Sequence, residues 1–180
     1  MLARLALATV AASVTLVVAT AAAAAVDPVE YEAAVSAVQA VDESIAVAAN
    51  SSDEDFVIGA GHNVNAVLAL SAQSGPNGES PSGRGIATAP STQTRFDVTC
   101  LDVAGNLAAV GVVVTRSTLL PVGTELIVFV RDTTLPGGTG DGHSVIALPA
   151  QACEGSAPVA ATVPPHEHGN WTVNDAVAAP

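Results

Sequence analysis

The sequence predicts an all-β protein built around a single antiparallel β-sandwich of about seven strands. Three observations lead to this prediction. Between residues 56 and 151, short apolar runs alternate with clusters of Gly, Pro, Asn and Ser at near-regular spacing, which is typical of a sandwich or barrel. Residues 94–100 alternate between apolar and polar side chains with a period of two. Two cysteines in a chain with an export signal favour a small domain tied by a disulfide.

Seven segments fit the strand pattern. The expected strands span residues 56–60, 64–72, 85–88, 94–103, 107–115, 125–131 and 143–148. In the clearest one, Phe96, Val98 and Cys100 alternate with polar residues, so we expect all three on the buried face. Residues 104–106 predict a hairpin turn. The run 110–114 is apolar on both faces and predicts a central strand.

The segments on either side of the sandwich lack the strand pattern. In residues 26–55, Asp27 and Pro28 resemble a helix start and apolar residues follow at helical spacing, so we expect a short helix or a loose leader there. Residues 154–180 are rich in Ala and Pro and predict a flexible tail, with one edge strand near residues 171–173. The sandwich itself is expected to span residues 56–153.

Residues 1–25 have the pattern of a secretory signal peptide. One arginine, Arg4, precedes an apolar run that ends in small residues, with Ala23 and Ala25 before the expected cleavage site. The alternative is an uncleaved membrane anchor, because the run is almost long enough to span a bilayer. Its alanine-rich composition favours cleavage. We therefore expect a secreted, extracellular protein with no membrane attachment after cleavage.

Cys100 and Cys153 are the two cysteines of the chain. In an oxidising compartment they allow one intrachain pairing. They do not form a CxxC pair, and neither has a histidine or a basic residue beside it that would favour a reactive thiolate. The sequence therefore predicts a structural Cys100–Cys153 disulfide rather than a redox or metal site.

The charge balance excludes two classes of partner. The chain has 17 Asp and Glu against 5 Arg and no Lys, a net charge of -12. Nucleic acids and anionic membrane surfaces are recognised by Lys and Arg, so neither is expected to bind. A hydrophobic content of 49% argues against a disordered acidic chain. The alanine-rich, lysine-free composition suggests a bacterial source.

One stretch resembles a known family. Its residues are Phe96-x-Val98-x-Cys100-Leu101-x-Val103-x-Gly105-Asn106-x-Ala108, followed by Val110-Gly111. They resemble a motif in a family of exported bacterial β-domains of unknown function. The family's strand ending in Asp, Pro-Gly turn and second Asp have counterparts at Asp132, Pro136-Gly137 and Asp141. The layout is also similar to the β-modules that follow choice-of-anchor domains. The resemblance covers about residues 56–153 and implies a fold and a compartment, but no activity or cofactor.

Five residues are candidate metal ligands. His166 and His168 would face the same way on an extended backbone and could share Zn²⁺ or Cu²⁺, with His143 as a third ligand. Asp132 and Asp141 flank a glycine-rich loop and could hold Ca²⁺ with backbone carbonyls. Two carboxylates are few for calcium, and the simpler interpretation is that Asp132 ends a strand and Asp141 caps a turn. We expect no bound metal and no other cofactor.

Catalytic patterns are scarce. The chain has no GxSxG elbow, and without lysine it has no phosphate-binding P-loop. Carboxylates dispersed along the chain could converge for hydrolysis, namely Glu79, Asp97, Asp102 and Glu125. An aromatic content of 3% argues against a sugar-binding cleft.

We expect an exported, non-catalytic structural or interaction module that contacts an unknown extracellular partner through its loops. Two alternatives remain open. One is an extracellular protein that binds Cu²⁺, Zn²⁺ or Ca²⁺, and the other is a hydrolase that uses the dispersed carboxylates.

Overall fold

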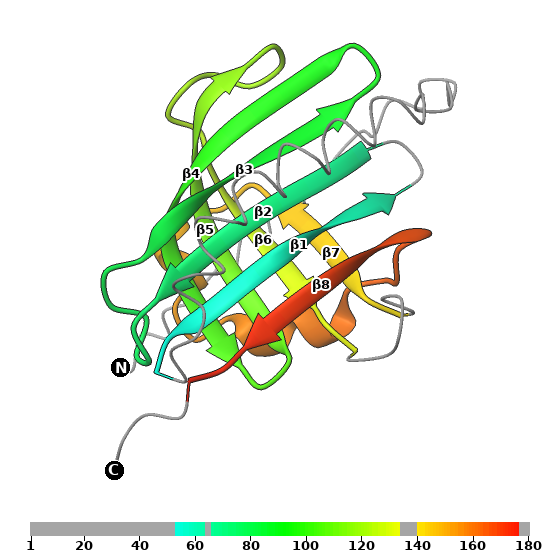
Figure 1. Cartoon of the computed structure of the whole chain (residues 1–180). Coiled ribbons are helices and arrows are strands. Elements are labelled where there is room, and N and C mark those ends of the chain that lie inside the picture. Colours follow the sequence, from blue (N-terminus) through cyan, green and yellow to red (C-terminus); the bar gives the residue numbers. More distant parts are fainter. Residues whose placement is uncertain (1–52, 64–65, 134–139, 177–180) are drawn as a thin grey trace, which may run out of the picture.

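The computed structural model describes residues 53–63, 66–133 and 140–176, without the side chain of His168. The expected signal peptide over residues 1–25, the segment 26–52 and the Pro136-Gly137 turn lie outside these residues. The described chain is all-β, with two short 3-10 helices, and thus agrees with the predicted fold class (Figure 1).

Eight strands form one antiparallel sheet. They are β1 (Asp55–Asn63), β2 (Ala66–Ser74), β3 (Ser82–Ala89), β4 (Thr92–Ala104), β5 (Leu107–Ser117), β6 (Glu125–Arg131), β7 (Gly142–Ile146) and β8 (His168–Asn174). Their order in the sheet is β7-β6-β5-β4-β3-β2-β1-β8. The 3-10 helices η2 (Ala150–Cys153) and η3 (Ala157–Thr162) lie between β7 and β8 in the chain. The seven predicted strands correspond to β1 to β7.

The strands form one antiparallel sheet that is nearly barrel-shaped, with eight strands, where the sequence predicted a single antiparallel sandwich of about seven. Each strand from β1 to β7 pairs with the next along the chain, and β8 pairs with β1. Within the part of the chain that the structure describes, no strand belongs to a second sheet. A long meander with the usual twist of β-strands coils on itself. The sheet therefore curls until its two outer strands, β7 and β8, approach each other (Figure 1).

Two apolar layers stabilise the barrel. The interior layer consists of inward-facing side chains from most strands, with Phe96, Leu101 and Trp171 as large members. The second layer lies outside the sheet and includes Ile127, Phe129 and Cys153. It is formed where η2 and η3 contact β4, β5 and β6. As predicted, β5 is buried on both faces, because one faces the interior and the other faces the 3-10 helices.

A β-bulge reverses the predicted orientation of Cys100. Phe96 and Val98 face the interior as expected, but the register between β4 and β5 shifts between Val98 and Cys100. One extra residue in a strand moves every later side chain to the other face. Leu101 therefore joins the interior, and Cys100 packs in the outer layer.

Gly111 makes room for η2 on the outside of the sheet. It pairs with Cys100 in the ladder. A Cβ atom at this position would lie 2.5 Å from the Ala150 carbonyl oxygen and 2.9 Å from Cβ of Cys100. Only glycine leaves enough space for the 3-10 helix to approach the strand this closely.

Residues 154–176 belong to the barrel, so the prediction of a flexible tail over 154–180 was wrong for its described part. The edge strand expected near residues 171–173 is confirmed, and it is longer than predicted, as β8. Ala157 and Ala160 of η3 and Trp171 of β8 are buried. The segment thus completes the sheet and covers part of its outer face.

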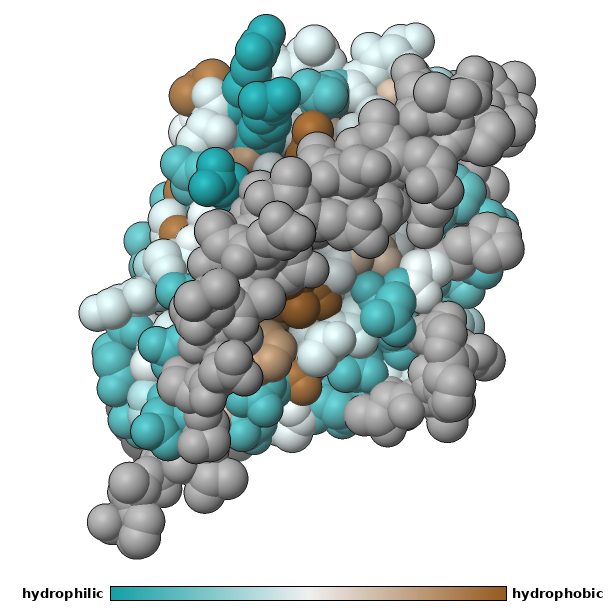
Figure 2. All heavy atoms as spheres, in the orientation of Figure 1, coloured by the Kyte–Doolittle hydropathy of each residue, from teal (hydrophilic) through white to brown (hydrophobic). Residues whose placement is uncertain are grey.

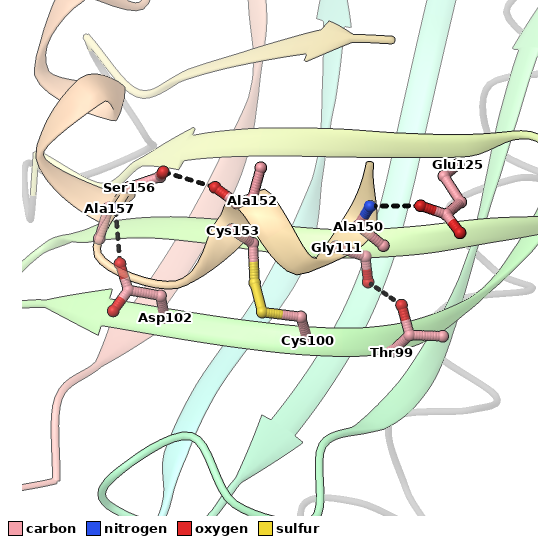
Figure 3. The surroundings of a disulfide bond; sticks show 10 residues. All are labelled: Thr99, Cys100, Asp102, Gly111, Glu125, Ala150, Ala152, Cys153, Ser156 and Ala157. Atoms are coloured by element: carbon pink, nitrogen blue, oxygen red, sulfur yellow. Dashed lines mark hydrogen bonds between the residues drawn. A yellow bond between two sulfur atoms is a disulfide. The ribbon is translucent and has the colours of Figure 1, made fainter. Parts of the chain in front are cut away.

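The predicted disulfide between Cys100 and Cys153 is confirmed (Figure 3). It joins β4 to the end of η2 across 53 residues of sequence. It therefore fixes the start of the C-terminal segment to the middle of the sheet.

Replacing both cysteines, Cys100→Ala with Cys153→Ala, is expected to lower the free energy of unfolding by about 4 kcal/mol, because an unfolded chain without the cross-link gains loop entropy. Urea denaturation of the oxidised protein and the variant measures the difference. A loss below about 1 kcal/mol would show that the disulfide does not stabilise this fold as argued.

Candidate functional site

The outer strands β7 and β8 meet at a seam that no ladder of backbone hydrogen bonds closes, since they are the two ends of the sheet order. We call this boundary the β7–β8 seam. Side chains span it instead. They come from β7, from the residues that flank β7 and β8, and from the ends of β1 and β6.

Two histidines contact each other at the seam, with their rings tilted by 47°. His143 of β7 and His166, which precedes β8, have ring centroids 4.4 Å apart, and Nδ1 of His143 lies 3.3 Å from Nε2 of His166. The His166 ring occupies the space above Gly61 of β1, where a Cβ atom would lie 2.3 Å from the ring. Glycine at this position therefore lets His166 fold over the end of the barrel.

Trp171 and Asn63 fix the proton positions of the two rings. The Trp171 indole Nε1 donates to Nε2 of His166 at 2.6 Å, so that nitrogen is an acceptor and the proton lies on Nδ1. Nδ1 of His166 faces Oδ1 of Asn63 at 3.2 Å. The Asn63 amide nitrogen lies 3.5 Å from Nε2 of His143, which directs the Nδ1 proton of His143 toward His166.

This arrangement favours uncharged imidazoles. Burial, with a smaller contribution from the neighbouring His166, lowers the pKa of His143 to about 3. Burial also lowers the pKa of His166 to about 4; Asp141 opposes the shift, and Arg131 and His62 add to it. Both side chains are therefore neutral at physiological pH and act as hydrogen-bonding groups.

Two buried carboxylates bind the edge of β8. Asp141 Oδ2 accepts the backbone N–H of Trp171 at 2.9 Å, and Asp132 Oδ2 accepts that of Val173 at 3.1 Å. The other oxygen of Asp141 accepts the backbone N–H and the hydroxyl of Thr133. The carboxylates thus replace, for β8, the carbonyl partners that a ninth strand would supply.

The same type of bond recurs along the C-terminal segment. Within the described residues, five carboxylates accept backbone N–H groups of residues 150–176. They are Glu125 with Ala150, Asp102 with Ala157, Asp141 with Trp171, Asp132 with Val173, and Asp55 with Ala176. Figure 3 shows the first two on either side of the disulfide. Acidic residues therefore attach this segment to the barrel at intervals from η2 to the end of β8.

Three of the five candidate metal ligands lie close together in the structure, but their nitrogen and oxygen atoms face different hydrogen-bond partners and not one common point. His143, His166 and Asp141 meet at the seam, and Asp132 binds β8 further along. The ring nitrogens and the oxygens of Asp141 are engaged in the hydrogen bonds above. Among the residues that the structure describes, no group of three or more His, Cys, Asp or Glu side chains could hold a metal ion. His168 lies in β8, and its side chain is outside the description.

A separate, acidic cavity of about 420 Å³ lies between the start of β1 and residues 99–103 of β4. It is lined by Asp55, Asp102 and Glu154 together with backbone and apolar atoms near Leu101. Burial raises the pKa of Asp55, the bond from Ala176 opposes the rise, and the charges of Asp175, Glu79 and Asp102 add to it. Of the four predicted hydrolytic carboxylates, Asp102 lines this cavity and Glu79 lies close enough to act on Asp55.

The other two predicted hydrolytic carboxylates lie elsewhere. Glu125 binds the backbone of Ala150, and Asp97 is exposed on β4 opposite Arg84. Sequence reasoning missed Asn63, Trp171 and Asp55 as members of these sites. The one relevant signal in the sequence was the predicted strand over residues 56–60, which directly follows a polar break ending at Asp55. It indicated that Asp55 would lie at the start of the first strand.

No family model, curated protein or solved structure matches this chain. Among the described residues, no helix is long and apolar enough to cross a membrane.

Substituting Asp141→Asn is expected to lower the free energy of unfolding by about 3 kcal/mol, because an amide nitrogen replaces one of the two buried oxygens that receive Thr133 and Trp171. Equilibrium urea denaturation at neutral pH measures the loss.

Asp97→Asn is the matched control for this substitution. Asp97 is exposed on the outer face of β4, so the same chemical change there should alter the stability by less than about 0.5 kcal/mol. Equal losses in the two variants would mean that Asp141 is not a structural acceptor.

Proposed function

We propose that this protein is an exported, non-catalytic interaction module that binds an extracellular protein through one end of the barrel. The observation that supports it best is a group of exposed apolar residues at that end. Leu119 and Val122 in the β5–β6 loop are 70% and 71% exposed. Ile146 and Leu148, at and just beyond the end of β7, are also exposed. We call these four residues the apolar end.

The ladder register places the two parts of the apolar end on the same side of the molecule. Glu125 begins β6 directly after the β5–β6 loop, and Ile127 of β6 pairs with Ile146 of β7. β7 therefore ends beside the start of β6, next to the end of the β5–β6 loop. The face in view in Figure 2 carries mainly hydrophilic and neutral residues on its described surface, with small scattered apolar groups. An apolar concentration on an acidic protein is a typical mark of a contact surface.

Export is supported by the signal-peptide pattern of residues 1–25 and by the disulfide. A disulfide across 53 residues forms and persists in an oxidising environment outside the cytosol.

We also propose a distant relationship to the exported bacterial β-domains that the sequence resembles. Two residues of the resemblance, Asn106 and Asp132, are hydrogen-bonded to each other in this fold. Asn106 of the β4–β5 turn donates its side-chain amide to the Asp132 carbonyl and accepts the Asp132 N–H. Asp141 lies across the same end of the barrel, where it binds β8. The bond between Asn106 and Asp132, and the role of Asp132 and Asp141 as acceptors for β8, support this proposal.

A hydrolase is the second candidate, and the acidic cavity favours it, because a carboxyl group with a raised pKa beside other carboxylates is a common arrangement of acid and base. Against it, Asp55 and Asp102 each use an oxygen to bind the backbone of the C-terminal segment. The cavity lining also contains no aromatic side chain. The third candidate, a metal-binding protein, predicts heat on titration of metal-stripped protein with Cu²⁺, Zn²⁺ or Ca²⁺.

The double variant Leu119→Ser with Val122→Ser is expected to lose partner binding without losing the fold, since both side chains are exposed. The immobilised mature protein is incubated with the extracellular and surface proteins of the producing cell, and bound proteins are quantified by mass spectrometry. Proteins held by the unmodified chain should fall about tenfold or more on the variant.

Val159→Ser is the matched control, because Val159 is an exposed apolar residue on η3, away from the apolar end. It should retain the same proteins as the unmodified chain. Identical retention by all three proteins would contradict a partner site at the apolar end. An esterase or glycosidase activity lost in Asp55→Asn would favour the hydrolase instead.

A further inference from the structure

The β7–β8 seam differs chemically from every other strand boundary in the described sheet. The other neighbours are joined by backbone ladders, whose donors and acceptors do not titrate. Across the seam, the carboxylates of Asp132 and Asp141 accept N–H groups of β8, the His143 and His166 rings contact each other, and one backbone bond joins His166 to the Asp141 carbonyl. A pair of titratable histidines therefore takes part in closing this barrel, whereas the sheet is built by groups that do not titrate.

The seam is closed at His143 and already open two residues later. His143 pairs with Val130 and Val145 pairs with Val128, and both partners face the barrel interior. His143 is buried, whereas Val145 is 44% exposed. The cluster of His143, His166 and Trp171 is thus the point where β8 last covers β7.

Charged and titratable groups face this cluster from each element packed against it. Arg131 and Asp132 lie at the end of β6, and Arg131 donates to the Gly140 carbonyl at 2.9 Å. Asp141 precedes β7, with its carbonyl accepting the N–H of His166. On the other side, His62 of β1 lies 3.6 Å from the carboxylate of Glu167, which precedes β8. The groups at the seam therefore carry both signs of charge, with Arg131 opposing a further cation.

We propose that the β7–β8 seam is a proton-operated closure: mild acid separates β8 from β7 and exposes the barrel interior, while β1 to β7 keep their ladders. β8 stays on β1, with which it shares a register of seven residue pairs. The disulfide keeps η2 on β4. The part that moves is thus the β1–β8 edge together with the residues leading into β8.

Acid favours the open seam because of the chemistry of His166. Its Nε2 accepts the Trp171 indole N–H within the segment that carries β8, and it lies 3.3 Å from Nδ1 of His143 across the seam. A protonated imidazole has no acceptor left, so protonation removes both contacts and leaves a partly buried cation. Protonated His143 would also face protonated His166 at 3.3 Å. Once the seam opens, both rings enter water and regain an ordinary affinity for protons.

The pH range of opening follows from comparing the pKa values of the two histidines in the closed and in the open state. The closed state holds the pKa of His166 at about 4 and that of His143 at about 3. An opened, solvated histidine titrates near 6.5. The closed state is therefore fully favoured above pH 6.5. Below it, the ratio of open to closed protein rises by up to about tenfold per pH unit for each histidine.

Trp171 is the sole tryptophan of the chain and reports directly on the seam. Its side chain is 2% exposed in the closed barrel. In the intact mature protein, lowering the pH from neutral to about 4 should shift its emission to longer wavelength and increase quenching by acrylamide. Far-UV circular dichroism should retain the strand signal over the same range. Unchanged Trp171 exposure, or exposure only together with loss of the strand signal, would overturn the proposal.

The double variant His143→Asn with His166→Gln removes both titrating rings and keeps an amide donor and an acceptor near the original nitrogens. Its Trp171 transition should move down by more than about one pH unit. The control, Asp97→Asn, changes an exposed carboxylate on the outer face of β4, away from the seam, and should open at the original pH. Opening of the double variant at the original pH would overturn the proposal.

Amide hydrogen exchange of the unmodified protein gives a test that needs no variant. After correction for intrinsic exchange, the N–H groups of Trp171 and Val173 should lose protection between pH 6.5 and about 4, while those of β4 and β5 keep it. Equal loss in both sets would mean global unfolding and would refute a local closure.

Discussion

Hydrogen bonds from backbone amides to carboxylates hold residues 150–176 on the sheet, and the closure of the barrel depends on them. Without these bonds, β8 would lose its carboxylate partners on its outer side, and η2 and η3 would be held on β4 to β6 by apolar contact, the disulfide and one bond from Arg131 to the Ala161 carbonyl. The Asp and Glu residues responsible come from β1, β4 and β6 and from the residues next to β6 and β7. A charged acceptor forms a stronger hydrogen bond than a carbonyl oxygen, which offsets part of the cost of burying Asp132 and Asp141.

This use of acids changes the meaning of the net charge of -12. From the sequence, the acidity argues for solubility and against anionic partners. In the structure, several of the same residues serve as structural acceptors in place of a further strand. The histidine pair at the seam has a similar structural role, because its neutral rings form hydrogen bonds that connect β1, β7 and the segment leading into β8 without adding charge.

Most of the sheet could be predicted from the sequence, because period-two alternation and turn residues are local signals. The hairpin at Gly105 and Asn106 and the central position of β5 follow from such signals, and the disulfide follows from the presence of two cysteines in an exported chain. The orientation of Cys100 was not predicted, because Cys100 continues the alternation of Phe96 and Val98, and the bulge that shifts it depends on how β4 meets β5. The barrel was predicted as a sandwich because short strands with regular turns suit both architectures.

The order of the C-terminal segment was missed for a related reason. Its η3 and β8 contain few large apolar residues, and the groups that hold them are acids far away in sequence, such as Asp55, which binds Ala176 across 121 residues. The cluster of His143, His166 and Trp171 likewise depends on that segment returning to β7. Histidine spacing alone suggested a metal site, whereas the contacts are those of hydrogen-bonded, uncharged rings.

Amide exchange measured by NMR at neutral pH tests the central claim most directly. The amides of Ala150, Ala157, Trp171, Val173 and Ala176 have carboxylate partners and no ladder partner. If carboxylates hold this segment, these five amides exchange as slowly as amides in the central ladder of β4 and β5. Exchange at the rate of an unstructured chain would contradict the account.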